Sequence, residues 1–294
     1  MAELGYKRRF GDRKEGRLIR SLPPYNRITP YIMGKKNDAC NQFSDSVEVT
    51  VLDQWFREKR QEGWKGMGML HLFVAAYVRA VASCPSLNRF VSGQKIYARN
   101  NIEVVMTVKK ALTADAEETS IKVVFEPTDT IFDVYRKMNE KVDEIKADDG
   151  ENGTEKVAGL LMKIPGLLLK FAVWFLNLLD YFGWLPQALL DVSPFHGSMI
   201  VTDLGSIGIP PIYHHLYNFG NLPVFIAFGA KRRVVELDKT GTPVERKYVD
   251  YKVVMDERTA DGLTYATAFK YLKYYMKNPA ALELPPEKVE ADVL

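Results

Sequence analysis

Apolar and polar residues recur at regular spacings along most of this chain, and the spacing predicts its secondary structure. Val47, Val49 and Val51 alternate with polar residues, which is the period-two pattern of a half-buried strand. Residues 68–83 are largely apolar and predict a buried helix that stops before Pro85. The first part of the chain therefore predicts a strand followed by a core helix.

The middle of the chain predicts more strands and one amphipathic helix. Residues 94–98, 102–108 and 120–126 have strand patterns, and the first two are joined by the turn-prone sequence Arg99-Asn100-Asn101. Residues 130–146 predict a helix, with Thr128 or Asp129 as its N-cap. Its apolar residues form one stripe: Ile131, Val134, Tyr135, Met138 and Val142.

The last hundred residues predict strands closed by a helix. Strand patterns cover 197–202, 223–229 and 246–255, and residues 261–277 predict the final helix. Four of its residues are expected to face the core: Leu263, Ala266, Phe269 and Leu272. Strands mixed with helices, without regular alternation, predict an α+β fold in which helices flank a mixed sheet.

The segment 157–190 is unusually apolar, and three interpretations of it stay open. It can form helices that cover the core or line a substrate channel, it can contact a membrane surface, or it can span a bilayer. Lys163, Lys170 and Asp180, together with two prolines, interrupt it. Because a span needs about 20 largely apolar residues, these interruptions favour the first interpretation.

Composition limits the classes of protein to consider. The chain has 294 residues, of which 47% are hydrophobic, and its net charge is +3. Residues 1–21 form a basic arm that lacks interleaved aromatic residues, so no nucleic-acid partner is expected. Cys40 and Cys84 form no CxxC pair, which argues against a zinc or redox site, and a disulfide between them is only weakly favoured. No secretory signal is visible, so a cytoplasmic location is expected, with membrane association as an alternative.

One short motif carries a family resemblance. Residues 255–262 read Met-Asp-Glu-Arg-Thr-Ala-Asp-Gly. The motif resembles the DHRxxDG active-site signature of dihydrolipoyl acyltransferases, in the superfamily that includes chloramphenicol acetyltransferase. Asp256, Arg258, Asp261 and Gly262 match the signature, and Glu257 occupies the position of the catalytic histidine.

Other blocks agree with this resemblance in order and spacing. Residues 202–208 resemble the SNLGxxG strand and turn of the family, and 225–229 resemble the strand that follows it. Residues 85–88 and 101–104 resemble its PxLN and DVNIGVA stretches. The resemblance implies one acyltransferase-like domain over 22–294 with a chloramphenicol acetyltransferase-like sheet, interrupted by an apolar helical insertion at about 155–195.

The resemblance also implies roles for individual residues. In the family a histidine is the general base, and a hydroxyl on the SNLG strand donates to the tetrahedral oxyanion. These positions fall on Glu257 and Thr202, whereas Asp261 corresponds to an aspartate that is usually structural, with Arg17 or Arg20 as its expected partner. An ordinary glutamate is a weaker base than histidine by about two pKa units, or roughly 3 kcal/mol, and burial would restore part of that basicity.

Four histidines are candidates to replace the missing one. His71 lies in the buried helix pattern and is interpreted as a core residue, and His196 precedes the strand of Thr202. His214 and His215 lie in a loop that reaches toward the acyl channel in the family. They are therefore candidate substrate-binding residues, although two adjacent histidines are not by themselves a metal site.

Together these residues predict an acyltransferase that moves an acyl group from a coenzyme A-like thioester to a small thiol or hydroxyl acceptor. The resemblance implies a homotrimer with sites between subunits, and no tightly bound cofactor or metal is expected. The alternative is a catalytically inactive member that keeps the fold as a structural or regulatory acyl-binding protein. Glu257 is the main support for that alternative.

Overall fold

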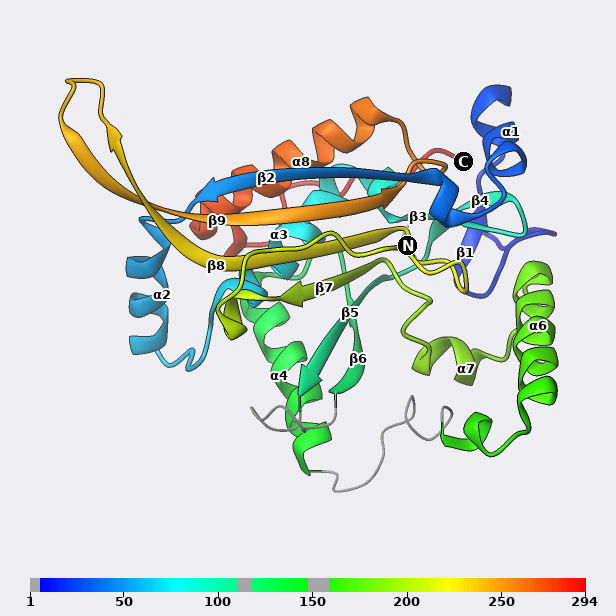
Figure 1. The fold of residues 1–294 in the computed structure, drawn as a ribbon. Coiled ribbons are helices and arrows are strands. Elements are labelled where there is room, and N and C mark those ends of the chain that lie inside the picture. The colour runs from blue at the N-terminus through cyan, green and yellow to red at the C-terminus, as the bar shows by residue number, and fades with distance from the viewer. Residues whose placement is uncertain (1–5, 110–117, 148–158) are drawn as a thin grey trace.

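The computed structural model describes residues 6–109, 118–147 and 159–294, and its centre is a six-stranded mixed sheet (Figure 1). In spatial order the strands are β2 (Cys40–Glu48), β9 (Pro243–Asp256), β8 (Val224–Leu237), β7 (Met199–Asp203), β5 (Ile102–Lys109) and β6 (Glu118–Phe125). β7 runs parallel to both β5 and β8, and the other neighbours are antiparallel. The predicted α+β class and mixed sheet are confirmed.

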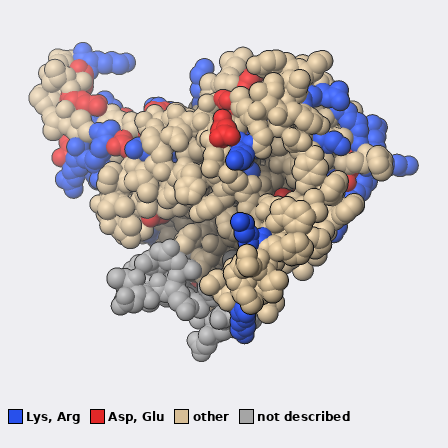
Figure 2. All heavy atoms as spheres, turned by 45° about the vertical axis from the view of Figure 1, so that its right-hand side comes forward, with Lys and Arg blue, Asp and Glu red and all other residues tan. Residues whose placement is uncertain are grey.

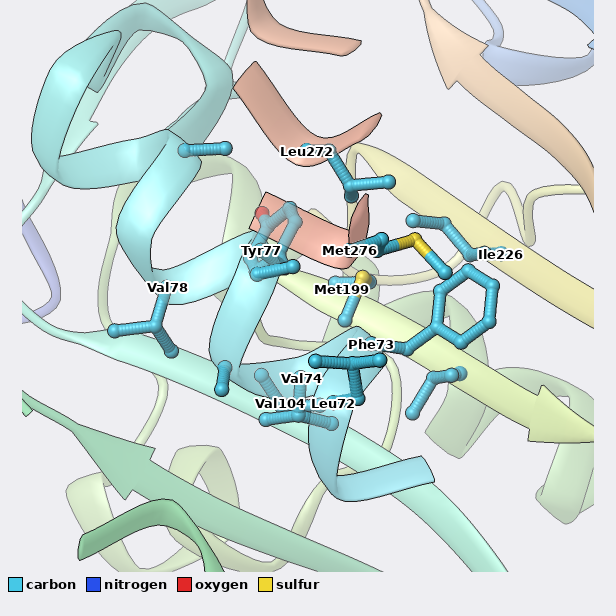
Figure 3. Packing of buried hydrophobic residues seen from close by; sticks show 14 of the residues in the cluster. Leu72, Phe73, Val74, Tyr77, Val78, Val104, Met199, Ile226, Leu272 and Met276 are labelled. Atoms are coloured by element: carbon cyan, nitrogen blue, oxygen red, sulfur yellow. The ribbon is translucent and has the colours of Figure 1, made fainter. Parts of the chain in front are cut away.

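Helices cover one face of this sheet and enclose the main core. They are α3 (Met69–Ser83), α4 (Ile131–Ala147) and α8 (Gly262–Lys277). Figure 3 shows Phe73 and Tyr77 of α3 packed against side chains from the sheet and from α8. Phe73 also stacks on Phe228, with ring centroids 4.3 Å apart. The predicted buried helix over 68–83 is confirmed as the central helix of this core.

The opposite face of the sheet carries a smaller core that the β7–β8 connection covers. Side chains alternate between the two faces of a strand, so Ile200 and Phe225 point away from the helices while their neighbours join the main core. Leu216 and Leu222, both in the connection, are buried against them. Thr202 lies on this second face as well.

A second, three-stranded antiparallel sheet lies beside the first, in the order β1 (Gly16–Leu18), β4 (Lys95–Arg99), β3 (Arg89–Ser92). The two strand patterns predicted around residues 94–108 therefore belong to different sheets. Arg17 of β1 donates hydrogen bonds to the backbone oxygens of Asp292 and Val293, each at 2.7 Å. Arg89 of β3 forms a buried ion pair with the Asp292 carboxylate. The N-terminal strand thus holds the last residues of the chain.

Three local predictions were wrong in register. In α8 the buried residues are Tyr265, Ala268, Phe269, Leu272 and Met276. Leu263 and Ala266 are exposed because a stripe read at every third residue drifts around a helix of 3.6 residues per turn. The cap of α4 is Thr130, which exchanges hydrogen bonds with Asp133. Val51 lies beyond the end of β2 and is exposed.

The remaining helices lie at the periphery: α1 (Pro24–Ile32), α2 (Leu52–Gln61), α6 (Gly166–Phe182) and α7 (Gln187–Val192). Asp180 is the one buried residue of α6, so the expectation that the apolar segment covers the core was wrong for this helix, although Leu185 and Leu190 of the same segment are buried. Over the described ranges, the chain contains no helix with the length and apolar character that crossing a membrane requires.

Candidate active site

Residues 256–261 form the turn between β9 and α8, called the motif turn below. This turn is built around a buried ion pair. Asp256, which is 1% exposed, accepts hydrogen bonds from Nε and Nη2 of Arg258 at 2.8 and 2.7 Å. Nη1 of Arg258 donates to the backbone oxygen of Met33 at 3.0 Å. The hydroxyls of Thr259 and Tyr265 both donate to the backbone oxygen of Asp256. Because these groups are held in this way, the backbone of the turn is fixed.

Glu257 lies at the tip of this fixed turn. Its backbone N–H donates to the carbonyl of Ala39 at 2.9 Å, which ties the turn to the start of β2. Its side chain is half-buried, and among the described residues its carboxylate has no hydrogen-bond or ion-pair partner. The backbone at this position is therefore well defined, whereas no contact among the described residues fixes the carboxylate.

An open groove of about 420 Å³ runs beside the turn, between β2 and α8. Met255 and Gly262, which flank the turn on either side, line its end. Phe43 and Phe269 form an apolar wall and Lys270 adds positive charge, whereas Lys273 is paired with the carboxylate of Asp45, which also lines the groove. A groove with this mixture suits a ligand that has an apolar part and an anionic part.

Asp261 is the N-cap of α8. Its Oδ1 accepts the N–H of Thr264 at 2.8 Å, and this hydrogen bond lowers the pKa of the carboxyl. The expected partners are elsewhere, because Arg17 binds the C-terminal residues and Arg20 binds Asp12. The arginine pairing expected for Asp261 was therefore wrong, and its contacts give it a role in starting α8.

Thr202 lies near the end of β7, on the sheet face that the β7–β8 connection covers. Its partner in β8 is Ala227, which in turn pairs with Lys252 of β9. The side chain is half-buried, on the same face as Ile200. Its hydroxyl can therefore reach a ligand on that face.

The structure does not bring Thr202 and Glu257 together within one chain. Glu257 lies five residues beyond Lys252, and β8 separates β9 from β7. Strand rise and strand spacing then place the two Cα atoms roughly 20 Å apart. A site that uses both residues therefore cannot be formed by one chain alone.

His214 and His215 lie in the β7–β8 connection, above the Thr202 face. The His214 ring stacks on Phe225 with centroids 4.3 Å apart, and burial followed by the charge of His215 lowers its pKa. Nε2 of His214 is buried and has no hydrogen-bond partner among the described residues. His215 is exposed and contacts the Tyr217 ring edge-on. Of the pair, His214 is the one whose ring is fixed.

A buried polar cluster behind the motif turn escaped the sequence analysis. Lys36 is 4% exposed, its Nζ has no hydrogen-bond partner among the described residues, and burial lowers its pKa to about 7. His196 accompanies it, with Nδ1 2.7 Å from the Ser193 hydroxyl and Nε2 3.5 Å from the Asp180 carboxylate. The sequence gives no local signal for this cluster because its members come from distant segments.

His71 and the two cysteines show no sign of a catalytic or metal-binding role. Nδ1 of His71 accepts the N–H of Gly68, and burial lowers the pKa of His71 to about 4, so it is a neutral residue of α3. Cys40 and Cys84 are free thiols. Within the described ranges no group of three or more His, Cys, Asp or Glu residues is arranged to hold a metal ion.

Known proteins resemble this chain in structure, whereas comparison by sequence finds no match. No protein-family model and no curated protein matches the chain. A probable dihydrolipoamide acetyltransferase from Listeria monocytogenes 4b F2365 superposes with a TM-score of 0.57 at 14% identity, covering 88% of this chain and 94% of the other. A chloramphenicol acetyltransferase superposes with a TM-score of 0.51 at 11% identity, covering 86% and 94%.

This chain has the chloramphenicol acetyltransferase-like fold. The dihydrolipoamide acetyltransferase of Azotobacter vinelandii also shares it, with a TM-score of 0.55 at 13% identity over 90% of this chain and 94% of that one. That structure was studied for the role of a serine, a histidine and an asparagine in the catalytic mechanism. The resemblance found in the motif blocks is thus confirmed for the chloramphenicol acetyltransferase-like fold, and the chemistry has to be argued from the site.

Proposed function

We propose that this protein is an acyltransferase that uses Glu257 as its general base and a coenzyme A-like thioester as its donor. The observation that carries the proposal is the motif turn. The buried Asp256–Arg258 pair and the Thr259 and Tyr265 hydroxyls hold residue 257 at the end of β9, beside an open groove. A buried ion pair is costly to maintain, and here it fixes a turn that carries an ionisable residue and whose flanking residues, Met255 and Gly262, line a ligand-sized groove.

The reaction balances with the residues available. The acceptor thiol or hydroxyl gives its proton to the Glu257 carboxylate and attacks the thioester carbonyl carbon. The hydroxyl of Thr202 donates a hydrogen bond to the resulting oxyanion. When the tetrahedral intermediate collapses, the carbon–sulfur bond breaks and the leaving thiolate takes the proton back from Glu257. The products are the acylated acceptor and the free thiol of the donor.

This mechanism needs two copies of the chain. Glu257 and Thr202 of one copy are roughly 20 Å apart, too far to act on the same carbonyl group. Glu257 of one copy therefore works with Thr202 of a neighbour. The arrangement supports a closed homo-oligomer, and the family resemblance favours a trimer.

A relative of known structure supports the choice of residues. In the Azotobacter vinelandii enzyme the studied asparagine follows the histidine by four positions, as Asp261 follows Glu257, and the serine precedes the histidine by about fifty positions. Thr202 precedes Glu257 by a similar interval. Under this proposal Asp261 fixes the start of α8 and His214 lines the acyl side of the site.

The second candidate is a protein that binds acyl thioesters and no longer transfers the acyl group. The observation in its favour is that the Glu257 carboxylate has no partner to orient it among the described residues. A flexible carboxylate loses the fixed geometry on which general base catalysis depends.

One experiment separates the two candidates. The full chain is incubated with short- and long-chain acyl-coenzyme A donors and with thiol and alcohol acceptors, and release of free thiol is measured. We expect Glu257→Gln to lower kcat by about a hundredfold or more, because it removes the base. Thr202→Val should cost about a hundredfold as well, because it removes the oxyanion donor. Glu245→Gln, an exposed change on the β8–β9 hairpin, is the matched control.

The other outcomes are equally informative. If the wild-type chain binds acyl-coenzyme A without turnover and Glu257→His gains activity, the acyl-binding protein is correct. If the wild-type chain binds no acyl thioester, both candidates are wrong. Turnover that Glu257→Gln leaves unchanged would show that another group is the base.

A further inference from the structure

The helix α6 is apolar on almost every side and yet exposed. Among its seventeen residues only Lys170, Asn177 and Asp180 carry a charged or amide side chain. Leu167, Phe171 and Trp174 are 86%, 60% and 56% exposed. Helices with this composition are normally buried, and exposed apolar patches of this kind mark interaction sites.

The helix is fixed to the body of the molecule at its C-terminal end. Arg13 donates to the backbone oxygens of Asp180 and Tyr181, each at 2.6 Å. Lys14 donates to the backbone oxygen of Leu185 at 2.9 Å, and the Tyr181 hydroxyl donates to Gln94 at 3.0 Å. Figure 1 shows α6 at the right-hand edge of the molecule, away from the sheet. The hydrogen bonds therefore fix α6 in place while its apolar side chains remain exposed.

Aromatic side chains dominate the exposed surface of α6 and of the turn after it. Phe171 lies against Trp174, with ring centroids 5.5 Å apart, and Phe182 stacks on Trp184 at 4.8 Å. Tryptophan and tyrosine favour the boundary between lipid headgroups and acyl chains, because one end of the ring is polar and the rest is apolar. This composition suits a lipid surface better than an aqueous one.

The exposed charges on α6 and in the turn before it are positive. Lys163 and Lys170 are exposed, and the only acidic residue in 159–190 is Asp180, which is buried beside Arg13. Exposed Lys14 lies at the C-terminal end of the helix. Figure 2 turns this edge forward and shows a mainly tan lower right surface with blue groups at its margins. The surface is therefore complementary to anionic headgroups.

We propose that α6 lies flat on a bilayer that contains anionic lipid, with Phe171, Trp174 and Phe182 inserted below the headgroups. Seventeen residues give a helix of about 25 Å, which is shorter than a span and adequate for surface attachment. A contact between two copies would bury the lysines, which are depleted in protein interfaces. The proposal concerns attachment and does not depend on acyl transfer.

Vesicle flotation of the full chain tests this attachment. Vesicles of phosphatidylcholine alone are compared with vesicles that also contain phosphatidylglycerol, and bound protein and tryptophan emission are measured. We expect binding to the anionic vesicles with a blue shift in emission. The double variant Phe171→Glu, Trp174→Glu should weaken binding at least about tenfold, because two large apolar groups no longer insert. Lys163→Glu with Lys170→Glu should remove the preference for anionic vesicles.

A matched control lies on the hairpin tip at the opposite end of the molecule. Val235 and Leu237 are each 70% exposed, so Val235→Glu with Leu237→Glu removes a similar apolar exposure and should leave vesicle binding unchanged. Equal losses in the two double variants, or no flotation of the wild-type chain, would overturn the proposal. It would also be overturned if the α6 variant changed the sedimentation of the protein without lipid, since the helix would then bind another copy.

Discussion

Lys36 is a single buried residue whose amine makes the stability of this protein depend on pH. The charges that act on it are the carboxylates of Asp256 and Asp180 and the guanidinium groups of Arg258 and Arg99. Its Nζ has no hydrogen-bond partner among the described residues, and burial lowers its pKa to about 7. Near neutral pH the folded chain therefore bears most of the cost of an unpaired buried ammonium.

This cost predicts a pH-dependent effect of Lys36→Met. In the unfolded chain the lysine pKa is about 10.4, so between pH 7 and pH 10 the unfolded state binds more protons and wild-type stability rises with pH. We expect Lys36→Met to stabilise the fold most near pH 6. The advantage should shrink by an amount on the order of 4 kcal/mol as the pH approaches 10. Urea unfolding at several pH values measures it.

Lys239→Met, on the exposed hairpin, is the control for Lys36→Met and should show no such dependence. A stability difference for Lys36→Met that stays constant from pH 6 to pH 10 would contradict the assignment of a lowered pKa to this lysine.

In the candidate site, residues that are neighbours in the sequence could be predicted, and residues that meet only through folding could not. Asp256, Glu257 and Arg258 lie together in one motif, so their relation could be predicted from order alone. Lys36, Asp180 and His196 meet only after three distant segments have folded, and no local pattern signals a contact of that kind. Sequence reasoning therefore found the motif turn and missed the charges packed behind it.

At the scale of the element, α8 depends on its first residue. Asp261 accepts the N–H of Thr264, which would otherwise be unpaired at the start of the helix. We expect Asp261→Ala to lower the free energy of unfolding by about 1 kcal/mol and Asp261→Asn to lower it much less. Thermal unfolding of the three proteins measures the difference.

Activity measurements on the same variants test whether Asp261 takes part in the chemistry. If Asp261→Ala keeps wild-type stability and abolishes turnover, the carboxylate acts on the substrate and the capping role is secondary.

Elements with strong periodicity could be predicted, and those that depend on neighbours could not. The α3 pattern is nearly all apolar and leaves little choice of register. In α8 the spacing of Leu263 to Phe269 resembles a stripe and predicts a core residue, whereas the Leu263 side chain is 77% exposed. The three-residue strand β1 exists because β4 offers it a partner, and that partner is invisible in a local pattern.

At the scale of the whole molecule, the distance between Glu257 and Thr202 predicts complementation between inactive chains. If each site takes its base from one copy and its oxyanion donor from another, mixed assemblies of Glu257→Gln and Thr202→Val chains contain some intact sites. In a trimer that contains both kinds of chain about one site in three is intact, so the doubly tagged fraction should recover about a third of wild-type activity. Co-expression with two different tags, followed by tandem purification and the thiol-release assay, measures it.

Activity in the mixture that stays at the level of the separate variants would place both groups in one chain. Sedimentation of the unmixed proteins gives the number of copies and shows whether either substitution has altered assembly.

The contact between Arg17 and the backbone oxygens of Asp292 and Val293 has a consequence for how the chain acquires its fold. It joins residues 275 and 276 positions apart, so it can form only after residues 292 and 293 have been synthesised. Until then the strand at the beginning of the chain lacks its last partner. Contacts of such long sequence separation slow folding, because the entropy of closing the intervening loop is lost before the contact is made. The small sheet is thus expected to be among the last parts of the molecule to become ordered.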